Sequence, residues 1–234
     1  MFRRALILTV AVIAFQPFPV TAAVPNSPVM PCGIPEQTIR NVQGQLAEVA
    51  NLNNGGLFQP SQMWSAVVDR DGKVCSVLAN SLDAWPGSRA IALAKAFTAN
   101  GFSNHVLAFS TTMLYQATQP GGSLWGLNES NPFNPAALQT NALTNAIVGG
   151  IITFGGGVAL YSGGAVIGGL GLSGDTSCAD HVIAYRMRKR AHLDGIPTGK
   201  VPSDNISYIG GPVTAGQPFL QPHCLPSDIA PANI

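Results

Sequence analysis

The sequence predicts an α/β (α+β) domain in which an antiparallel sheet is flanked by helices. Helical and extended patterns follow one another in the order helix, two strands, helix, short helix, two or more strands, helix. The strands come in pairs separated by short glycine-containing turns, which is typical of antiparallel hairpins. The chain has no βαβ repeat and no dinucleotide-binding fingerprint. Its 234 residues suffice for a single domain with a substantial core.

Helices are predicted from apolar residues at intervals of three and four and from the residues that end each pattern. Pro35 lies near the start of the first helix, and the second opens at Pro86 and ends at Gly101. Ser110 is expected to cap the short third helix, and Asp175, Thr176 or Ser177 the last, with Gly195 near its end. The predicted helices span residues 31–51, 86–100, 111–118 and about 177–195.

Strands are predicted in two hairpins. The first joins residues 64–68 and 74–78 through an Asp-Gly turn, and the second joins 158–161 and 165–172 through Gly163 and Gly164. Residues 147–174 carry no charge and are long enough for a membrane span, but their glycines are spaced like strand ends and turns. Uninterrupted apolar strands instead favour a sheet covered on both faces.

The two ends of the chain indicate export. Arg3 and Arg4 precede a short apolar run, and small residues at Ala22 and Ala23 follow it, as in a cleaved secretory signal peptide. The expected location is therefore periplasmic or secreted, with no membrane span in the mature chain. The predicted organisation is a signal peptide at residues 1–23, an N-terminal helix and linker at 24–60, a core domain at 61–195 and a Pro/Gly-rich tail at 196–234.

The composition argues against nucleic acid as a partner and favours association with further copies of the chain. Charged residues make up 10% of the chain and the net charge is +1, so the clustered Lys and Arg of a nucleic-acid-binding protein are missing. A surface with few charges and many glycines is expected to be partly covered by other copies of the chain, which predicts a homo-oligomer.

Four cysteines in an exported chain predict disulfide bonds. No two of them have the C-x-x-C spacing of a metal site. Three pairings are possible, and we favour Cys32–Cys224, which would tie the two ends together, with Cys75–Cys178 inside the domain.

A ligand site is predicted where the glycine-rich strand runs into the last helix. Backbone N–H groups at a helix N-terminus attract anions, and glycine lets a ligand approach the main chain. The candidates are Gly171, Ser173, Gly174 and Thr176. The alternative is that these glycines relieve crowding and that Asp175 itself fills the anion position.

One face of the last helix carries a second set of candidates. His181, Tyr185, Arg188 and His192 recur at intervals of four, three and four, and His or Tyr can ligate heme iron while Arg can bind a propionate. His181 is the candidate metal ligand. For Arg188 and His192 we favour a solvated face. In the second helix, Lys95 and Arg89 could meet an anionic ligand, although Lys95 could equally pair with an aspartate or reach solvent.

Residues 64–193 resemble the GlcG/HbpS-like family, also called the heme-degrading or PduO C-terminal-like family. The resemblance rests on residues 64–72, 94–99, 155–160, 168–174 and 180–184. It is greatest for an exported branch that carries residues 85–89, 119–124 and 173–181. Two features depart from the family: Asp180-His181 replaces an Asp-Glu pair, and residues 116–149 are longer than in the minimal domain.

The resemblance implies a profilin-like antiparallel sheet of about five strands, homo-oligomers and, for some members, heme or iron binding. Together with the residues it predicts an exported heme- or iron-binding protein, for which binding is favoured over catalysis, with the ligand between the glycine-rich strand end and the helices bearing Lys95 and His181. A binding module for a small carboxylate, or a purely structural oligomer, are the alternatives.

Overall fold

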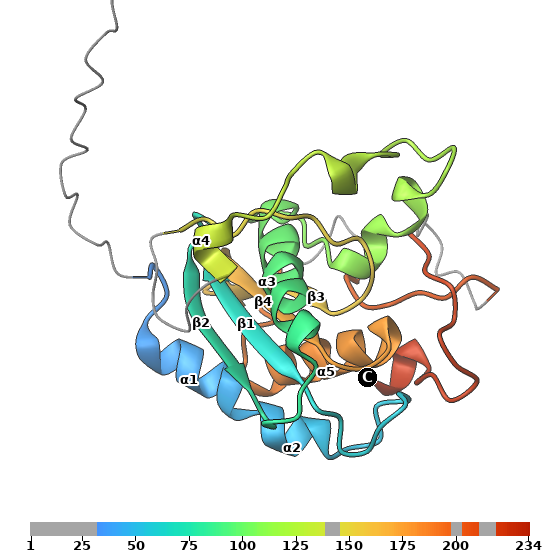
Figure 1. Cartoon of the computed structure of the whole chain (residues 1–234), viewed down its shortest axis with the longest axis horizontal. Coiled ribbons are helices and arrows are strands. Elements are labelled where there is room, and N and C mark those ends of the chain that lie inside the picture. Colours follow the sequence, from blue (N-terminus) through green and yellow to red (C-terminus); the bar gives the residue numbers. More distant parts are fainter. Residues whose placement is uncertain (1–31, 139–145, 198–202, 211–218) are drawn as a thin grey trace, which may run out of the picture.

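In the computed structural model, two helical layers enclose a four-stranded antiparallel sheet (Figure 1). Residues 32–138, 146–197, 203–210 and 219–234 are described. The predicted signal peptide at residues 1–23 lies outside them, as do parts of the predicted tail. In the described chain, no helix has the length and apolar character needed to cross a membrane.

The sheet is built from two hairpins that meet side by side. Strands β1 (Trp64–Asp69) and β2 (Val74–Ala79) form the first, and β3 (Gly157–Ser162) and β4 (Ala165–Ser173) form the second. The central strands β1 and β4 pair antiparallel, which gives the order β2-β1-β4-β3. Both predicted hairpins and the fold class are therefore confirmed.

The described residues form four strands, one fewer than the predicted five. The segment ahead of β3 makes only isolated bridges, Lys73 with Ile147 and Phe133 with Gly149. Gly149 and Gly150 have φ values of +65° and +73°, which a strand cannot continue through. The long loop is thus held against the sheet edge without extending it.

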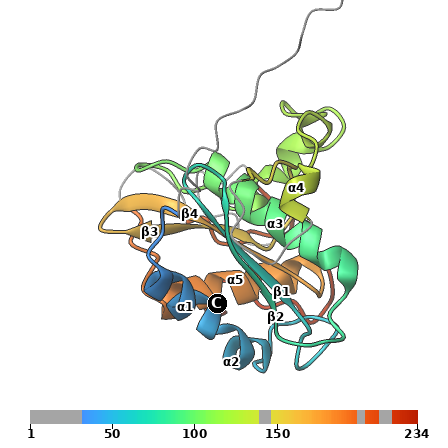
Figure 2. The same ribbon diagram turned by 60° about the vertical axis from the view of Figure 1, so that its left-hand side comes forward.

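Helix α3 (Pro86–Gly101) covers one face of the sheet, and α1 (Glu36–Gly44), α2 (Leu46–Ala50) and α5 (Ser177–Arg190) cover the other (Figure 2). The glycines of β4 permit the close approach of α3. A Cβ at Gly171 would lie 2.0 Å from the Ala92 carbonyl oxygen, and one at Gly169 would lie 2.1 Å from that of Ala96. Relief of crowding therefore explains these glycines.

Three helix predictions need correction. The first helix, predicted over residues 31–51, begins only after Pro35 and is interrupted at Gln45, which follows a glycine. The predicted third helix consists of two 3₁₀ turns (Thr111–Leu114 and Gln116–Thr118), and Ser110 makes no capping bond. Helix α5 stops at Arg190, ahead of the predicted end, and His192 is left-handed with φ +58°. A further short helix, α4 (Pro135–Leu138), ends the first described range, and a 3₁₀ turn (Pro231–Asn233) lies near the C-terminus.

The predicted disulfide pairing is wrong. Cys32 bonds to Cys75 and Cys178 bonds to Cys224, with Cα–Cα distances of 5.3 and 6.0 Å. Cys32 lies just ahead of α1, which packs on the sheet beside β2, whereas the tail returns across the start of α5. Each end of the chain is therefore fastened to the core, and not to the other end.

Candidate functional site

His181 lies on α5 and is fully buried; the Asn205 side chain lies beside it, but neither ring nitrogen makes a hydrogen bond of regular geometry in the described part of the chain. A buried polar atom normally has a partner, so this imidazole is unusual. Burial lowers the pKa of His181 to about 4, against the smaller opposing effect of the Asp204 carboxylate. The ring is therefore neutral at physiological pH and keeps a free lone pair, as a metal ligand requires.

Tyr185 and Arg188 lie on the same side of α5 as His181. The rings of His181 and Tyr185 are 5.9 Å apart, and the Arg188 guanidinium lies 4.8 Å from the centre of the Tyr185 ring. The predicted helical face thus brings an imidazole, a phenol and a guanidinium together. His192 does not belong to this group, because it lies beyond the helix end and is exposed.

The prediction that Arg188 faces solvent is wrong. Its side chain is buried and forms two bonds to the carboxylate of Asp204, at 2.5 and 2.7 Å, and a third to the Ala159 carbonyl at 3.1 Å. The partner is 16 residues away in the tail, so helical spacing could not reveal it.

Lys95 forms a buried ion pair with Asp180. Its ammonium nitrogen lies 2.6 Å from Asp180 Oδ2, donates to the Leu172 carbonyl at 3.0 Å and lies 5.1 Å from the Phe154 ring centre. Burial raises the pKa of Asp180 to about 6, although the ammonium opposes this shift, and burial lowers the pKa of Lys95. The structure thus bears out the alternative that Lys95 pairs with an aspartate, whereas its role in ligand binding stays a prediction.

The glycine-rich strand end is filled by carboxylates of the protein itself. Asp180 Oδ1 accepts the N–H of Asp175 at 3.0 Å, and the Thr176 hydroxyl accepts that of Ala179 at 3.2 Å, which makes Thr176 the cap. The Asp175 carboxylate instead accepts the N–H of Leu57 at 2.7 Å. An anion site at this strand end, predicted from Gly171, Ser173, Gly174 and Thr176, is therefore already occupied.

Arg89 lies in the first turn of α3 and is half-buried, which lowers its pKa. Its predicted role together with Lys95 in binding a small carboxylate receives no support from the geometry, since Lys95 is taken by Asp180.

An open cavity lies elsewhere, between α1 and the edge strand β2. It has a volume of about 670 Å³ and is lined by Ile34, Ile39 and Leu78 together with the Cys32–Cys75 disulfide. Gln43, Arg40 and Glu36 supply most of its polar groups, and the last two pair with each other. None of its described lining residues is a His, Tyr or Met.

Residues 58–188, more than half of the chain, match the family described as "Haem degrading protein HbpS-like". The chain belongs to this HbpS-like family. Both α5 residues with unusual surroundings, His181 and Arg188, lie inside the matched region, whereas Cys32 and all of the tail lie outside it.

Two solved structures show the same fold as this HbpS-like chain. A protein described as a PduOC:heme complex is 25% identical, with a TM-score of 0.53, and the match covers 70% of this chain and 99% of that one. The Klebsiella pneumoniae protein ORFY is 24% identical with a TM-score of 0.52, covering 68% of this chain and 90% of that one. No curated protein matches the sequence.

The sequence prediction missed the tail residues that complete the site. Asp204 pairs with Arg188, and the Gln221 side chain accepts the N–H of Gly155 at 2.8 Å while donating to the Ser177 hydroxyl at 3.1 Å. The one available signal was Cys224, which showed that the tail had to be fastened somewhere.

Proposed function

We propose that this protein binds heme and that His181 supplies an axial ligand. The observation that carries the proposal is the buried, neutral imidazole, which has the Asn205 side chain beside it but makes no hydrogen bond of regular geometry with the described residues. Imidazole is a common ligand of heme iron, and the bound heme would supply redox or ligand-binding chemistry that the side chains lack. The similarity to the PduOC:heme complex supports the same ligand class.

The neighbours of His181 suit a porphyrin. Tyr185 offers an aromatic surface, and Arg188 offers a bidentate donor for a propionate, which it would meet in exchange for Asp204. The open cavity beside β2 is large enough for a flat ligand but has no His, Tyr or Met among its described lining residues. The chemistry of the donors therefore favours α5 over that cavity.

An absorption titration with hemin tests the proposal. The oxidised protein and the variants His181→Ala and His192→Ala are compared, since His192 is an exposed histidine just beyond the same helix. We expect a saturable Soret shift in the wild type and in His192→Ala, and its loss in His181→Ala. A wild-type titration that stays flat both before and after reduction, or an unchanged shift in His181→Ala, contradicts the proposal.

We propose binding and not catalysis as the main role. The same heme complex, incubated with a reductant and oxygen, distinguishes the two. A stable Soret band is expected of a binding protein, whereas its decay with release of iron would show that the heme is degraded.

We also propose that the protein is exported and that residues 1–23 are removed. The proposal is supported by two disulfide bonds, which persist in oxidising compartments. The intact mass of protein recovered from the periplasm of an expressing cell tests it, and the mass of the uncleaved chain would contradict it.

We also propose that the protein self-associates, because large apolar side chains are exposed on its surface. Trp85 and Phe58 are 59% and 43% exposed and line one shallow hollow near the start of α3. Sedimentation equilibrium of the wild type and of Trp85→Ser is the test, with a smaller assembly expected for the variant. A wild type that sediments as a monomer contradicts the proposal.

A further inference from the structure

Two segments of the tail lie together over α5. Residues 203–210 and 219–224 are joined by bonds from the Ile209 N–H to the Gln221 carbonyl and from the Gln221 N–H to the Ser207 carbonyl, at 3.0 and 2.9 Å. Ile206 and Tyr208 pack against Cys178 of α5. We call residues 203–210 and 219–224 the cover. His181 is fully buried, and two residues of the cover, Asp204 and Asn205, lie close enough to act on its imidazole, so we infer that the cover helps to shut His181 off from solvent.

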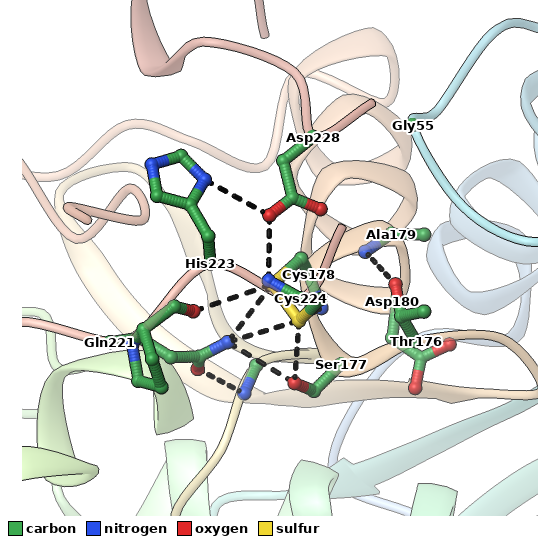
Figure 3. The surroundings of a disulfide bond; sticks show 12 residues. Gly55, Thr176, Ser177, Cys178, Ala179, Asp180, Gln221, His223, Cys224 and Asp228 are labelled. Atoms are coloured by element: carbon green, nitrogen blue, oxygen red, sulfur yellow. Dashed lines mark hydrogen bonds and ion pairs between the residues drawn. A yellow bond between two sulfur atoms is a disulfide. The ribbon is translucent and has the colours of Figure 1, made fainter. Parts of the chain in front are cut away.

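The cover is fastened to α5 at two places. At its first segment, Asp204 pairs with Arg188. At its second, Cys224 forms the disulfide with Cys178, and the Gln221 side chain bonds to Gly155 and Ser177 (Figure 3). A heme ligated by His181 therefore needs the cover to open, and the disulfide is the covalent obstacle to this movement.

The surroundings of the Cys178–Cys224 bond favour its reduced form. The sulfur of Cys224 lies 3.2 Å from the Cys178 N–H and 3.4 Å from the Ser177 hydroxyl, in the first turn of α5, and the Gln221 amide lies 3.4 Å from the Cys178 sulfur. Such donors stabilise thiolates, and a stabilised reduced form makes a disulfide easier to reduce. The Asp228 carboxylate is also near and opposes this effect, but it accepts bonds from the Cys224 N–H and from His223.

The other disulfide has fewer donors. The sulfur of Cys32 accepts the Ile34 N–H at 3.3 Å, and the Asp69 carboxylate lies close to both sulfurs. Its reduced form therefore receives less stabilisation. The two bonds close loops of similar size, with sequence separations of 43 and 46, so loop size does not distinguish them.

We propose that Cys178–Cys224 is a thiol–disulfide exchange site whose reduction by a dithiol releases the cover from His181. A thiolate of the dithiol attacks the sulfur of Cys224, which is half-buried where Cys178 is buried, and Cys178 leaves as a thiolate. The second thiol of the reductant then attacks the mixed disulfide and releases Cys224. The dithiol becomes a disulfide, and two electrons and two protons pass to the two cysteines. The consequence for heme rests on the proposed function, whereas the release of the cover does not.

Two measurements on the full chain, one chemical and one with hemin, test the inference. In the first, the wild type is treated with increasing dithiothreitol and alkylated, and peptide mapping gives the order in which the cysteines react. The modification of His181 by diethylpyrocarbonate is followed in the same samples, with His192 as the exposed reference. We expect Cys178 and Cys224 to react before Cys32 and Cys75, and His181 to become modifiable when they do.

The variants Cys178→Ser/Cys224→Ser and Cys32→Ser/Cys75→Ser form a matched pair. Only the first variant is expected to make His181 modifiable without reductant. We also expect it to bind hemin at least about tenfold more tightly than the oxidised wild type does, because it raises the fraction of open protein. Two results in the wild type overturn the inference, whether or not the variants fold. One is reduction of Cys32–Cys75 before Cys178–Cys224, and the other is a His181 that stays unmodified after Cys178 and Cys224 are reduced. Measurable hemin binding with equal affinity in the oxidised and reduced wild type also overturns it. Exposure of His181 without hemin binding in either state instead supports the release of the cover and contradicts the proposed function.

Discussion

Both ends of the described chain are fastened to the family core by a disulfide, but what each end covers differs. The N-terminal segment with Cys32 leads into α1, which borders an open apolar cavity of about 670 Å³ beside β2. The C-terminal segment with Cys224 closes over α5, where it buries His181 and neutralises Arg188. Cys75 and Cys178 lie within the matched family region, and their partners lie outside it.

This difference shows why an open cavity is not the best candidate site. The cavity at the N-terminal end is large but has no His, Tyr or Met among its described lining residues. The closed C-terminal end instead holds a neutral imidazole that makes no hydrogen bond of regular geometry with the described residues. Buried polar groups without partners cost free energy, so their presence calls for a functional explanation.

The largest effect on stability is expected from breaking the ion pair that fastens the cover. Arg188→Met leaves the Asp204 carboxylate buried without a partner, which we expect to lower the free energy of unfolding by about 3–5 kcal/mol. Urea denaturation measures it, with Arg190→Met as control, whose exposed pair with Glu48 should contribute under about 1 kcal/mol. Equal effects of the two variants would show that Arg188 does not hold the cover.

Removal of the N-terminal disulfide should destabilise the protein without exposing His181. Cys32→Ser/Cys75→Ser opens a loop with a sequence separation of 43, which we expect to lower the free energy of unfolding by about 2–4 kcal/mol. Denaturation together with diethylpyrocarbonate modification checks both parts. A large rise in His181 modification in the folded variant would contradict the assignment of the cover to the C-terminal end.

Acid should destabilise the wild type through His181. Its pKa falls from 6.5 in the unfolded chain to about 4 in the fold, so the unfolded state takes up the proton first as the pH falls. The contribution is fully present above pH 6.5 and is lost toward pH 4. Relative to His181→Gln, we expect the wild type to lose about 2 kcal/mol between pH 7 and pH 5. Asp180, whose pKa is raised to about 6, acts in both proteins and so cancels. Parallel pH curves would show that the imidazole is not buried.

The smallest expected effect concerns the start of α5, next to the C-terminal disulfide. Thr176→Ala removes the bond to the Ala179 N–H and should cost about 1 kcal/mol. Ser110→Ala is the control, because the Ser110 hydroxyl has no partner among the described residues and caps no helix. Thermal unfolding checks both, and a larger loss in Ser110→Ala would reverse the assignment.

The hairpins and α5 could be predicted because their signals are local. The Asp-Gly turn before Lys73 and the alternation of small and apolar residues in β4 fix the pairing within a few residues. From the sequence, the glycines of β4 allow two interpretations, an anion site or relief of crowding. Only the close approach of Ala92 and Ala96 in the structure decides for relief of crowding.

The candidate site could be predicted only in part. The spacing of His181 and Tyr185 placed them on one helical face, but whether that face was solvated depended on a tail more than ten residues away. The prediction of the disulfide pairing is wrong for a similar reason. Four cysteines permit three pairings, and no local pattern distinguishes them. Burial by a distant segment leaves no periodic signal at the residue that is buried.

Resonance Raman spectroscopy of the ferrous heme complex tests the central claim most directly, since it reports the bond between iron and histidine. Wild type and His192→Ala should show an iron–histidine stretch, His181→Gly should lack it, and added imidazole should restore it by filling the space left by the side chain. An iron–histidine band that persists unchanged in His181→Gly without imidazole would contradict the assignment of His181 as the heme ligand.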